Sequence, residues 1–161
     1  MRLSRIVLAS ESPRRLELLR SLGFVVEVAA SGYAEMPLPG VSPADLASYH
    51  AREKLRATLE MRGRPTDAPV LAADTVVDID GTALGKPRDL ADAARMLESL
   101  SGREHVVHTA FALAVPGSAT WTEERSSTRV HFYRLEAREI AEYLATGESL
   151  DKAGEIGRAH V

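Results

Sequence analysis

The sequence has no cysteine among its 161 residues, which excludes disulfide frameworks, thiolate zinc sites and cysteine nucleophiles. Aromatic residues are scarce, and no apolar run approaches the length of a membrane span or of the hydrophobic region of a signal peptide. Neither sign of charge dominates, because 20 basic residues accompany 23 acidic ones. The net charge therefore gives no general attraction to nucleic acid. We expect a cytoplasmic protein with no nucleic acid partner and no membrane contact.

The residues that are present have an ordinary globular composition, with 45% hydrophobic and 27% charged side chains. The length suits one domain that buries a core without disulfides. Capping and turn residues divide the hydrophobic pattern into elements. The expected strands are residues 5–9, 24–30, 70–80, 82–84, 104–115 and 119–135. The expected helices are residues 13–22, 43–61, 90–100 and 137–145. This order predicts the α/β class, as a single domain whose mixed, twisted sheet is flanked by helices.

The first candidate site is the segment 10–15, SESPRR, where a strand leads into a helix. Ser12 is a suitable N-cap, and Pro13 suits the first helical position. The unpaired amides of a helix N-terminus attract anions, and Arg14 and Arg15 add guanidinium groups that fit phosphate oxygens. Spacing alone favours the simpler alternative, a capped helix with two arginines facing solvent.

The second candidate is Asp74, which follows four apolar residues in an expected buried strand. A buried carboxylate has to be paired, bound to a metal or catalytic, because an isolated buried charge is costly. The alternative is that the strand emerges at Asp74 and the side chain caps a turn.

A third candidate, Gly85 to Asp89, brings Lys86 close after a hairpin but lacks the Walker pattern. A plain turn remains its alternative, and Lys54 by itself is typical of a solvated helix lysine.

Other chemistries find little support. His105 and His108 are three residues apart in an expected strand, so their side chains point to opposite faces and cannot hold one metal ion together. The sequence contains no Gly-x-Ser-x-Gly elbow and no dinucleotide-binding fingerprint. Nucleophilic serine and nicotinamide chemistry are therefore not indicated.

Six stretches together resemble the Maf family, also called septum formation inhibitor proteins, in the family's order and nearly at its spacing. They are Leu8 to Arg15 with Leu18, Leu19 and Gly23; Ala51 to Lys54; Ala73 to Thr75 with Gly81; Gly85 to Asp89; Leu100 to Gly102; and Asp151 to Gly154. Six ordered matches outweigh the simpler alternatives given above. The resemblance implies a Maf/ITPase-like domain over residues 1–154.

The resemblance also implies roles for particular residues. Asp74 would be the general base, or a metal-bound carboxylate, that prepares the attacking water. Glu35 occupies the position of a second acidic, metal-binding residue, although residues 31–34 depart from the usual family pattern. The residues implied in phosphate binding are Ser10, Ser12, Arg14, Arg15, Lys54 and Lys86. Arg14 and Thr75 fall at positions associated with the choice of base.

The activity implied is that of a nucleoside triphosphate pyrophosphatase, which cleaves dTTP or UTP to the monophosphate and pyrophosphate with a divalent cation, Mg²⁺ or Mn²⁺. Clearing modified nucleotides is compatible with it, and a homodimer stays open. One alternative is the 7-methyl-GTP branch of the family. Another is a regulatory binding protein in septum formation, which would not need Asp74, Lys54 and Lys86 together.

The end of the chain departs from the family pattern after Gly154. Family members usually continue with a Tyr-Gly-Ile-Gln-Gly-like stretch, whereas residues 155–161 read EIGRAHV. That heptapeptide matches one reading frame of a common sequencing-library adapter. We therefore expect residues 155–161 to be a non-native tail, and the C-terminal strands and helix of the family domain to be lacking.

Overall fold

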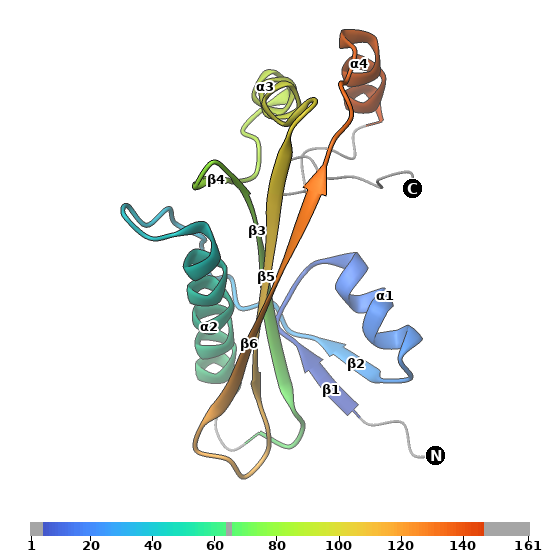
Figure 1. Ribbon diagram of the computed structural model, residues 1–161. Helices are drawn as coiled ribbons and strands as arrows, with labels where there is room; N and C mark the ends of the chain where they lie inside the picture. The colour runs from blue at the N-terminus through green and yellow to red at the C-terminus, as the bar shows by residue number, and fades with distance from the viewer. Residues whose placement is uncertain (1–4, 64–65, 147–161) are drawn as a thin grey trace. The chain divides into compact units, whose positions relative to one another are not determined.

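The computed structural model describes residues 5–63 and 66–146 (Figure 1). The strands are β1 Arg5–Leu8, β2 Val25–Val28, β3 Val70–Ile79, β4 Thr82–Leu84, β5 Glu104–Ala114 and β6 Trp121–His131. The helices are α1 Pro13–Ser21, α2 Pro43–Arg62, α3 Leu90–Leu100 and α4 Ala137–Ala145. Every expected helix and strand is confirmed, while β2 and β6 are shorter than expected. The Asp151 to Gly154 motif and the expected tail at 155–161 lie outside the described residues.

The sheet has the strand order β2-β1-β3-β5-β6 in the described part of the chain, and β4 pairs with β3. β1 runs parallel to β2 on one side, with Arg5 opposite Val25, and parallel to β3 on the other, with Leu8 opposite Leu71. β4 is antiparallel to β3. The expected mixed sheet flanked by helices is therefore confirmed. Because β1 and β3 are parallel and β1 ends opposite Leu71, the strand β3 continues past the carboxyl end of β1.

Contacts between Cα atoms group the chain into two compact units. The first comprises residues 1–40, 45–74 and 109–126, and the second comprises residues 41–44, 75–108 and 127–161. In the first unit, alternate residues of β1 pack on opposite faces of the sheet. Val7 belongs to the cluster that includes Leu55 and Leu59 of α2, whereas Leu8 belongs to the cluster that includes Leu19 of α1. α1 and α2 thus cover opposite faces (Figure 1).

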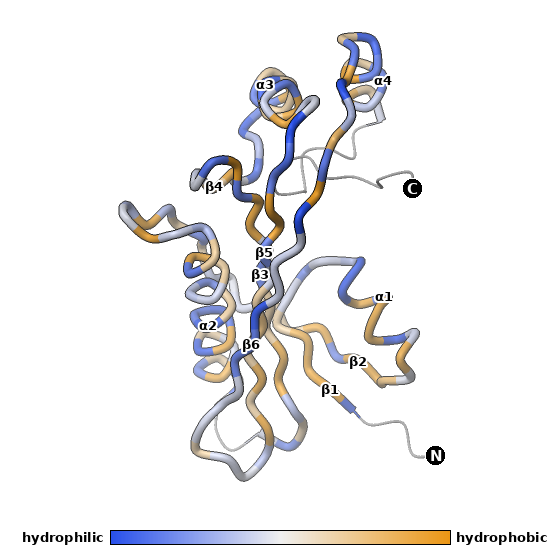
Figure 2. The backbone as a smooth tube through the Cα atoms, viewed as in Figure 1, coloured by the Kyte–Doolittle hydropathy of each residue, from blue (hydrophilic) through white to orange (hydrophobic). Residues whose placement is uncertain are grey.

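The helix α2 buries one side only. Its Ala51, Leu55 and Leu59 are at most 3% exposed, whereas Arg56 and Glu60 are exposed. Hydrophobic and hydrophilic residues consequently alternate along its turns (Figure 2). None of the described helices is both long and apolar enough to cross a membrane.

In the second unit, a tight hairpin joins β3 to β4. Asp80 and Gly81 have positive φ angles of 53° and 79°, as the two central residues of a type I′ turn require. The Gly81 amide donates a hydrogen bond to Asp78 Oδ1 at 2.7 Å. The hairpin expected shortly before Lys86 is therefore confirmed, with Asp80 and Gly81 at its turn, and the strand β3 continues through Asp74 to this turn.

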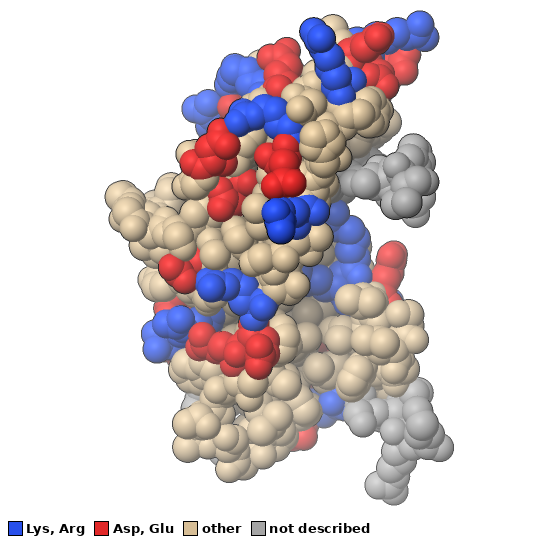
Figure 3. Space-filling view, in the orientation of Figure 1, with Lys and Arg blue, Asp and Glu red and all other residues tan. Residues whose placement is uncertain are grey.

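Acidic and basic side chains are interspersed on the face shown in Figure 3. Several form pairs within a unit, such as Arg125 with Asp45 at 2.9 Å in the first unit. This distribution agrees with the nearly balanced charge of the sequence.

Candidate functional site

The candidate site lies at the carboxyl end of β1, where the parallel strand β3 continues beyond it. β1 ends at Leu8, which is opposite Leu71, so Asp74 is three residues beyond the last paired position. The chain leaving β1 passes through Ser10 and enters α1 at Pro13. Ligand sites in open α/β sheets typically lie in this position, because loops and helix N-termini converge there.

Lys54 of α2 connects the two acidic candidates. Its Nζ atom donates to Glu35 Oε1 and to Asp74 Oδ1, each at 2.5 Å. Glu35 belongs to the segment 29–42 between β2 and α2, which forms no helix or strand. The side chain of Lys54 is only 13% exposed and that of Asp74 only 6%. The solvated-lysine alternative is therefore wrong, and so is the alternative that β3 emerges at Asp74.

Opposing effects set the proton affinity of Asp74. Burial raises its pKa above the ordinary value, and the nearby charge of Glu35 acts in the same direction. The ammonium group of Lys54 and the side chain of His50 lower it. Burial is the largest effect, so the pKa of the Asp74 carboxyl stays raised. A raised pKa makes the carboxylate a stronger base near neutral pH.

Arg15 lies on the same edge of the sheet, and its side chain is half-buried. Its Nη1 atom donates to Ser10 Oγ at 3.1 Å and to the Ala73 carbonyl at 2.9 Å, next to Asp74 in sequence. Burial lowers the pKa of the guanidinium, against the charges of Asp74 and Glu35, which raise it. Arginine nevertheless stays charged in proteins. The fixed positive group is thus held beside the carboxylates.

The N-terminus of α1 has the expected boundary. Ser12 occupies the N-cap position and Pro13 the first helical position. The Ser12 hydroxyl makes no capping hydrogen bond, whereas the Ser12 amide donates to Ser10 Oγ at 3.2 Å. Arg14 is exposed in the first turn. The expectation of two solvent-facing arginines is therefore correct for Arg14 and wrong for Arg15.

Two of the predicted residues belong to the second unit. Thr75 directly follows Asp74 in β3 and is half-buried. Lys86 is exposed in the segment between β4 and α3, where Asp89 accepts a hydrogen bond from the Asp92 amide and caps α3. Of the predicted residues, the structure thus brings together Ser10, Ser12, Arg15, Glu35, Lys54 and Asp74 in the first unit.

Sequence reasoning missed Tyr33 and His50. The Tyr33 hydroxyl and His50 Nδ1 share a hydrogen bond of 3.0 Å, and His50 is 4% exposed. One signal was available, because His50 precedes Lys54 by four residues on α2 and therefore lies on the same face of the helix. Nothing in the sequence pattern of residues 31–35 indicates their contact with α2.

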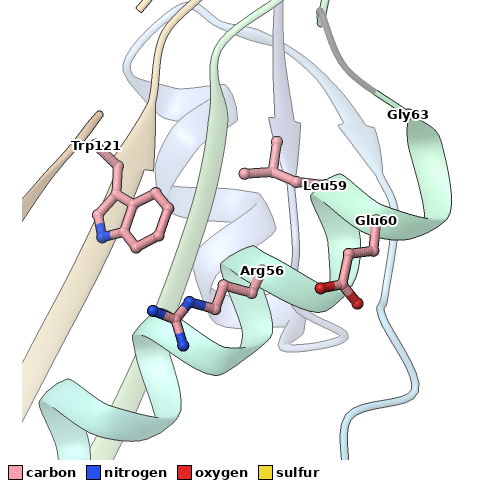
Figure 4. A pocket seen from close by; sticks show the side chains of 5 residues that line it. All are labelled: Arg56, Leu59, Glu60, Gly63 and Trp121. Atoms are coloured by element: carbon pink, nitrogen blue, oxygen red, sulfur yellow. The ribbon is translucent and has the colours of Figure 1, made fainter. Parts of the chain in front are cut away.

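A separate cavity of about 400 Å³ also belongs to the first unit. Arg56 points towards Trp121 across this cavity (Figure 4), with its guanidinium carbon 5.4 Å from the ring centroid. Leu59, Glu60 and Gly63 complete its lining. None of the predicted site residues lines it, so this cavity is distinct from the carboxylate site.

The fold and the site define an α/β protein in which a lysine binds one buried and one partly exposed carboxylate beside the carboxyl end of a parallel strand, with an arginine fixed nearby. The chain belongs to the Maf family: the family model described as "Maf-like protein" matches residues 5–160. The resemblance found in the sequence is therefore confirmed.

Several relatives are similar to this chain over most of its length. The dTTP/UTP pyrophosphatase of Anaeromyxobacter dehalogenans is 49% identical, over 93% of this chain and 75% of the relative. The dTTP/UTP pyrophosphatase of Thermus thermophilus is 47% identical, over 94% of this chain and 76% of the relative. Among solved structures, the Staphylococcus aureus Ham1 protein has a TM-score of 0.50 at 12% identity, covering 80% of this chain and 71% of that one. This last similarity concerns the fold alone.

Proposed function

We propose that this protein is a nucleoside triphosphate pyrophosphatase that hydrolyses dTTP and UTP to the monophosphate and pyrophosphate. The observation that carries the proposal is the contact of Lys54 Nζ with both Glu35 and Asp74 at 2.5 Å. Arg15 is fixed on the same sheet edge. The relatives that are 41–49% identical and bear the name dTTP/UTP pyrophosphatase support this substrate class.

In the proposed reaction, Asp74 accepts a proton from a water that attacks the α phosphorus of the triphosphate. The new bond from the water oxygen to this phosphorus forms as the bond to the oxygen bridging the α and β phosphates breaks, and pyrophosphate leaves. The raised pKa of this carboxyl suits a general base. Arg15 and Lys54 bind phosphate oxygens and stabilise the negative charge that develops on the pyrophosphate leaving group. Ser10, Ser12 and the amides at the start of α1 add neutral donors for the same oxygens. Lys86 is assigned to phosphate binding, like Arg15 and Lys54, by its place in the family motif.

A divalent cation, Mg²⁺ or Mn²⁺, completes the proposal. Glu35 and Asp74 fit such an ion, because two carboxylates from different parts of the chain meet at one positive group. Oxygen ligands suit these hard cations, and Mg²⁺ commonly binds one or two carboxylates together with substrate phosphates. When bound, the cation would neutralise charge on the phosphate oxygens. Glu35 and Asp74 are the residues that would hold it.

Base selection is assigned to Arg14 and Thr75. Arg14 is exposed in the first turn of α1, where its side chain is accessible to a ligand. Thr75 follows Asp74 directly and is half-buried. The proposal places the reaction in the cytoplasm, where nucleoside triphosphates are made and used, and it does not require a second protomer.

The test is pyrophosphate release from dTTP, UTP, 7-methyl-GTP and the common nucleotides with Mg²⁺. The wild-type chain is compared with Asp74→Asn, which keeps the shape of the side chain and removes its charge. Asp78→Asn is the matched control, because Asp78 lies on the same strand but bonds to Gly81 and His108. We expect release from dTTP and UTP that falls at least about a hundredfold in Asp74→Asn and persists in Asp78→Asn.

Melting temperatures of all three proteins establish that each one is folded. Release from 7-methyl-GTP instead would assign the chain to the other branch of the family. Retention of full activity in Asp74→Asn would overturn the assignment of the general base. A folded wild-type protein that is inactive on every nucleotide would overturn the proposed function itself.

A further inference from the structure

The segment 29–42 carries Glu35 without a helix or a strand to fix its position. Backbone of this kind is typically mobile unless side chains attach it to a rigid element. Glu35 itself is partly exposed, with 39% of its side-chain surface accessible. The position of this carboxylate therefore depends on contacts made by the segment around it.

Two contacts attach this segment to α2 side by side. Tyr33 bonds to His50 at 3.0 Å, and Glu35 bonds to Lys54 at 2.5 Å. The segment residues are two apart, and the helix residues are four apart and share one face. The segment thus follows α2 through two successive attachment points, of which only the second involves the proposed reaction.

The first attachment point is the more rigid of the two. His50 is 4% exposed, and its ring also packs in edge geometry with that of Tyr49, with centroids 5.7 Å apart. An imidazole packed in this way has few rotamers available, whereas the Lys54 ammonium ends a flexible four-carbon chain. The Tyr33 amide in turn donates to Ser31 Oγ at 3.2 Å, which fixes the backbone next to the tyrosine.

We infer that Tyr33 and His50 are positioning residues. They hold residues 31–40 of the segment 29–42 on α2, so that Glu35 stays beside Lys54 and Asp74. This inference rests on the proposed function only in assigning Glu35 a role in binding the divalent cation. Neither Tyr33 nor His50 takes part in the chemical step. Their hydrogen bond acts on the reaction through the position of one carboxylate.

The test compares Tyr33→Phe, which removes one oxygen atom, with Tyr49→Phe as the matched control. Both substitutions keep a ring in contact with His50. Two helix variants complete the set: His50→Leu removes the bond, and His50→Asn keeps a polar atom near the position of Nδ1. The double variant Tyr33→Phe/His50→Leu measures whether the two residues act as one unit.

The first readout is amide hydrogen exchange of the segment 31–40, measured without nucleotide or metal. We expect Tyr33→Phe and His50→Leu to accelerate exchange about fivefold, the effect of losing one net hydrogen bond. The double variant should be no faster than either single variant, and His50→Asn should approach the wild-type rate. Tyr49→Phe should leave the exchange of this segment unchanged.

The second readout is the Mg²⁺ concentration that gives half-maximal pyrophosphate release. It should rise about fivefold in Tyr33→Phe, with a smaller change in kcat at saturating Mg²⁺, because the carboxylate is displaced rather than lost. A mere loss of global stability would not produce this split. Identical exchange and Mg²⁺ dependence in Tyr33→Phe and Tyr49→Phe would overturn the inference while leaving the proposed function intact. If the wild-type chain is inactive but Tyr33→Phe still accelerates exchange of the segment, the proposed function is overturned and the attachment of the segment to α2 is supported.

Discussion

At the scale of single residues, Asp74 shows how one carboxyl group combines burial with chemistry. The group is 4% exposed, so water does not stabilise its charge. The Lys54 ammonium compensates in part, and Glu35 works against it. The Lys54 ammonium thus stabilises the buried carboxylate, but the pKa of Asp74 is still higher than that of an exposed aspartate. Both neighbours can be removed separately, which makes their contributions measurable.

We therefore expect opposite changes in the pKa of Asp74 in the metal-free protein. Glu35→Gln should lower this pKa, because it removes a nearby negative charge, and Lys54→Met should raise it, because it removes the positive one. Carbon-13 chemical shifts of the Asp74 carboxyl, followed by NMR during a pH titration, measure both effects. Glu60→Gln, on the exposed side of α2, is the control and should change nothing. No difference between wild type and Glu35→Gln would contradict the electrostatic account.

A second buried titratable group lies in the other unit. His105 is 2% exposed, packs edge-on against Phe132 at 4.9 Å, and has no hydrogen-bond partner for either ring nitrogen among the described residues. Burial lowers the pKa of this imidazole. The folded protein therefore keeps His105 neutral at a pH where the unfolded chain already binds a proton.

The free energy of unfolding should consequently fall with acidification. The ordinary pKa of histidine is about 6.5, and below this pH the unfolded chain binds one more proton than the folded protein. The free energy of unfolding therefore falls by roughly 1.4 kcal/mol per pH unit, until the pH reaches the lowered pKa of His105 in the folded protein. His105→Leu should abolish this contribution and stabilise the protein by roughly 1 kcal/mol at neutral pH. Urea unfolding between pH 8 and pH 5 measures both effects. His131→Gln, on an exposed histidine, should keep the wild-type pH dependence.

At the scale of elements, the β3–β4 hairpin depends on backbone conformation more than on packing. Gly81 has a φ of 79°, and a Cβ atom at this position would meet nothing within 4 Å. Gly81→Ala should therefore destabilise the protein by about 1 kcal/mol through backbone strain alone. Gly85→Ala is the matched control, because Gly85 has equal space but no positive φ. Equal denaturation midpoints for the two variants would show that the turn tolerates a side chain.

The same hairpin illustrates which elements could be predicted. Asp80-Gly81 is a strong turn signal in sequence, and the apolar residues on both sides of it indicate strands. The ends of β6 were harder to predict from the sequence, because hydrogen bonds of individual residues just outside the strand decide them. Ser118 Oγ bonds to the Thr120 carbonyl at 2.9 Å and extends the turn as far as Trp121. The Phe132 amide bonds to the Arg103 carbonyl, where the strand has already ended.

The site residues that belong to family motifs could be predicted from the sequence, whereas those in the irregular segment between β2 and α2 could be predicted only in part. Asp74 and Lys54 stand in regular elements, so their burial and direction follow from the periodicity of β3 and α2 once the family motif identifies them. Tyr33 lies in a segment without period, and its contact with His50 spans 17 positions of sequence. Such contacts depend on the tertiary path of the chain, which local pattern does not encode.

At the scale of the whole molecule, the described residues place the proposed acid–base and cation-binding groups in one compact unit. Lys86 and Thr75 belong to the other. The strands β3, β5 and β6 contain residues of both units. A ligand that binds the folded chain stabilises everything that unfolds with its site, and this linkage gives a test that needs no turnover.

Mg²⁺ and a non-hydrolysable UTP analogue should therefore raise the melting temperature together by more than the sum of their separate effects, because each contributes binding groups for the other. At a hundredfold excess over Kd, ligand binding adds about 2.7 kcal/mol, or roughly 5–10 °C for a chain of this size. Differential scanning calorimetry measures the shift. Asp74→Asn should lose the part that depends on Mg²⁺, since half of the carboxylate pair is neutralised, while keeping the part due to the analogue alone. The same shift in the presence of a chelator would contradict a cation site at Glu35 and Asp74 and would leave the analogue bound by Arg15 and Lys54 only.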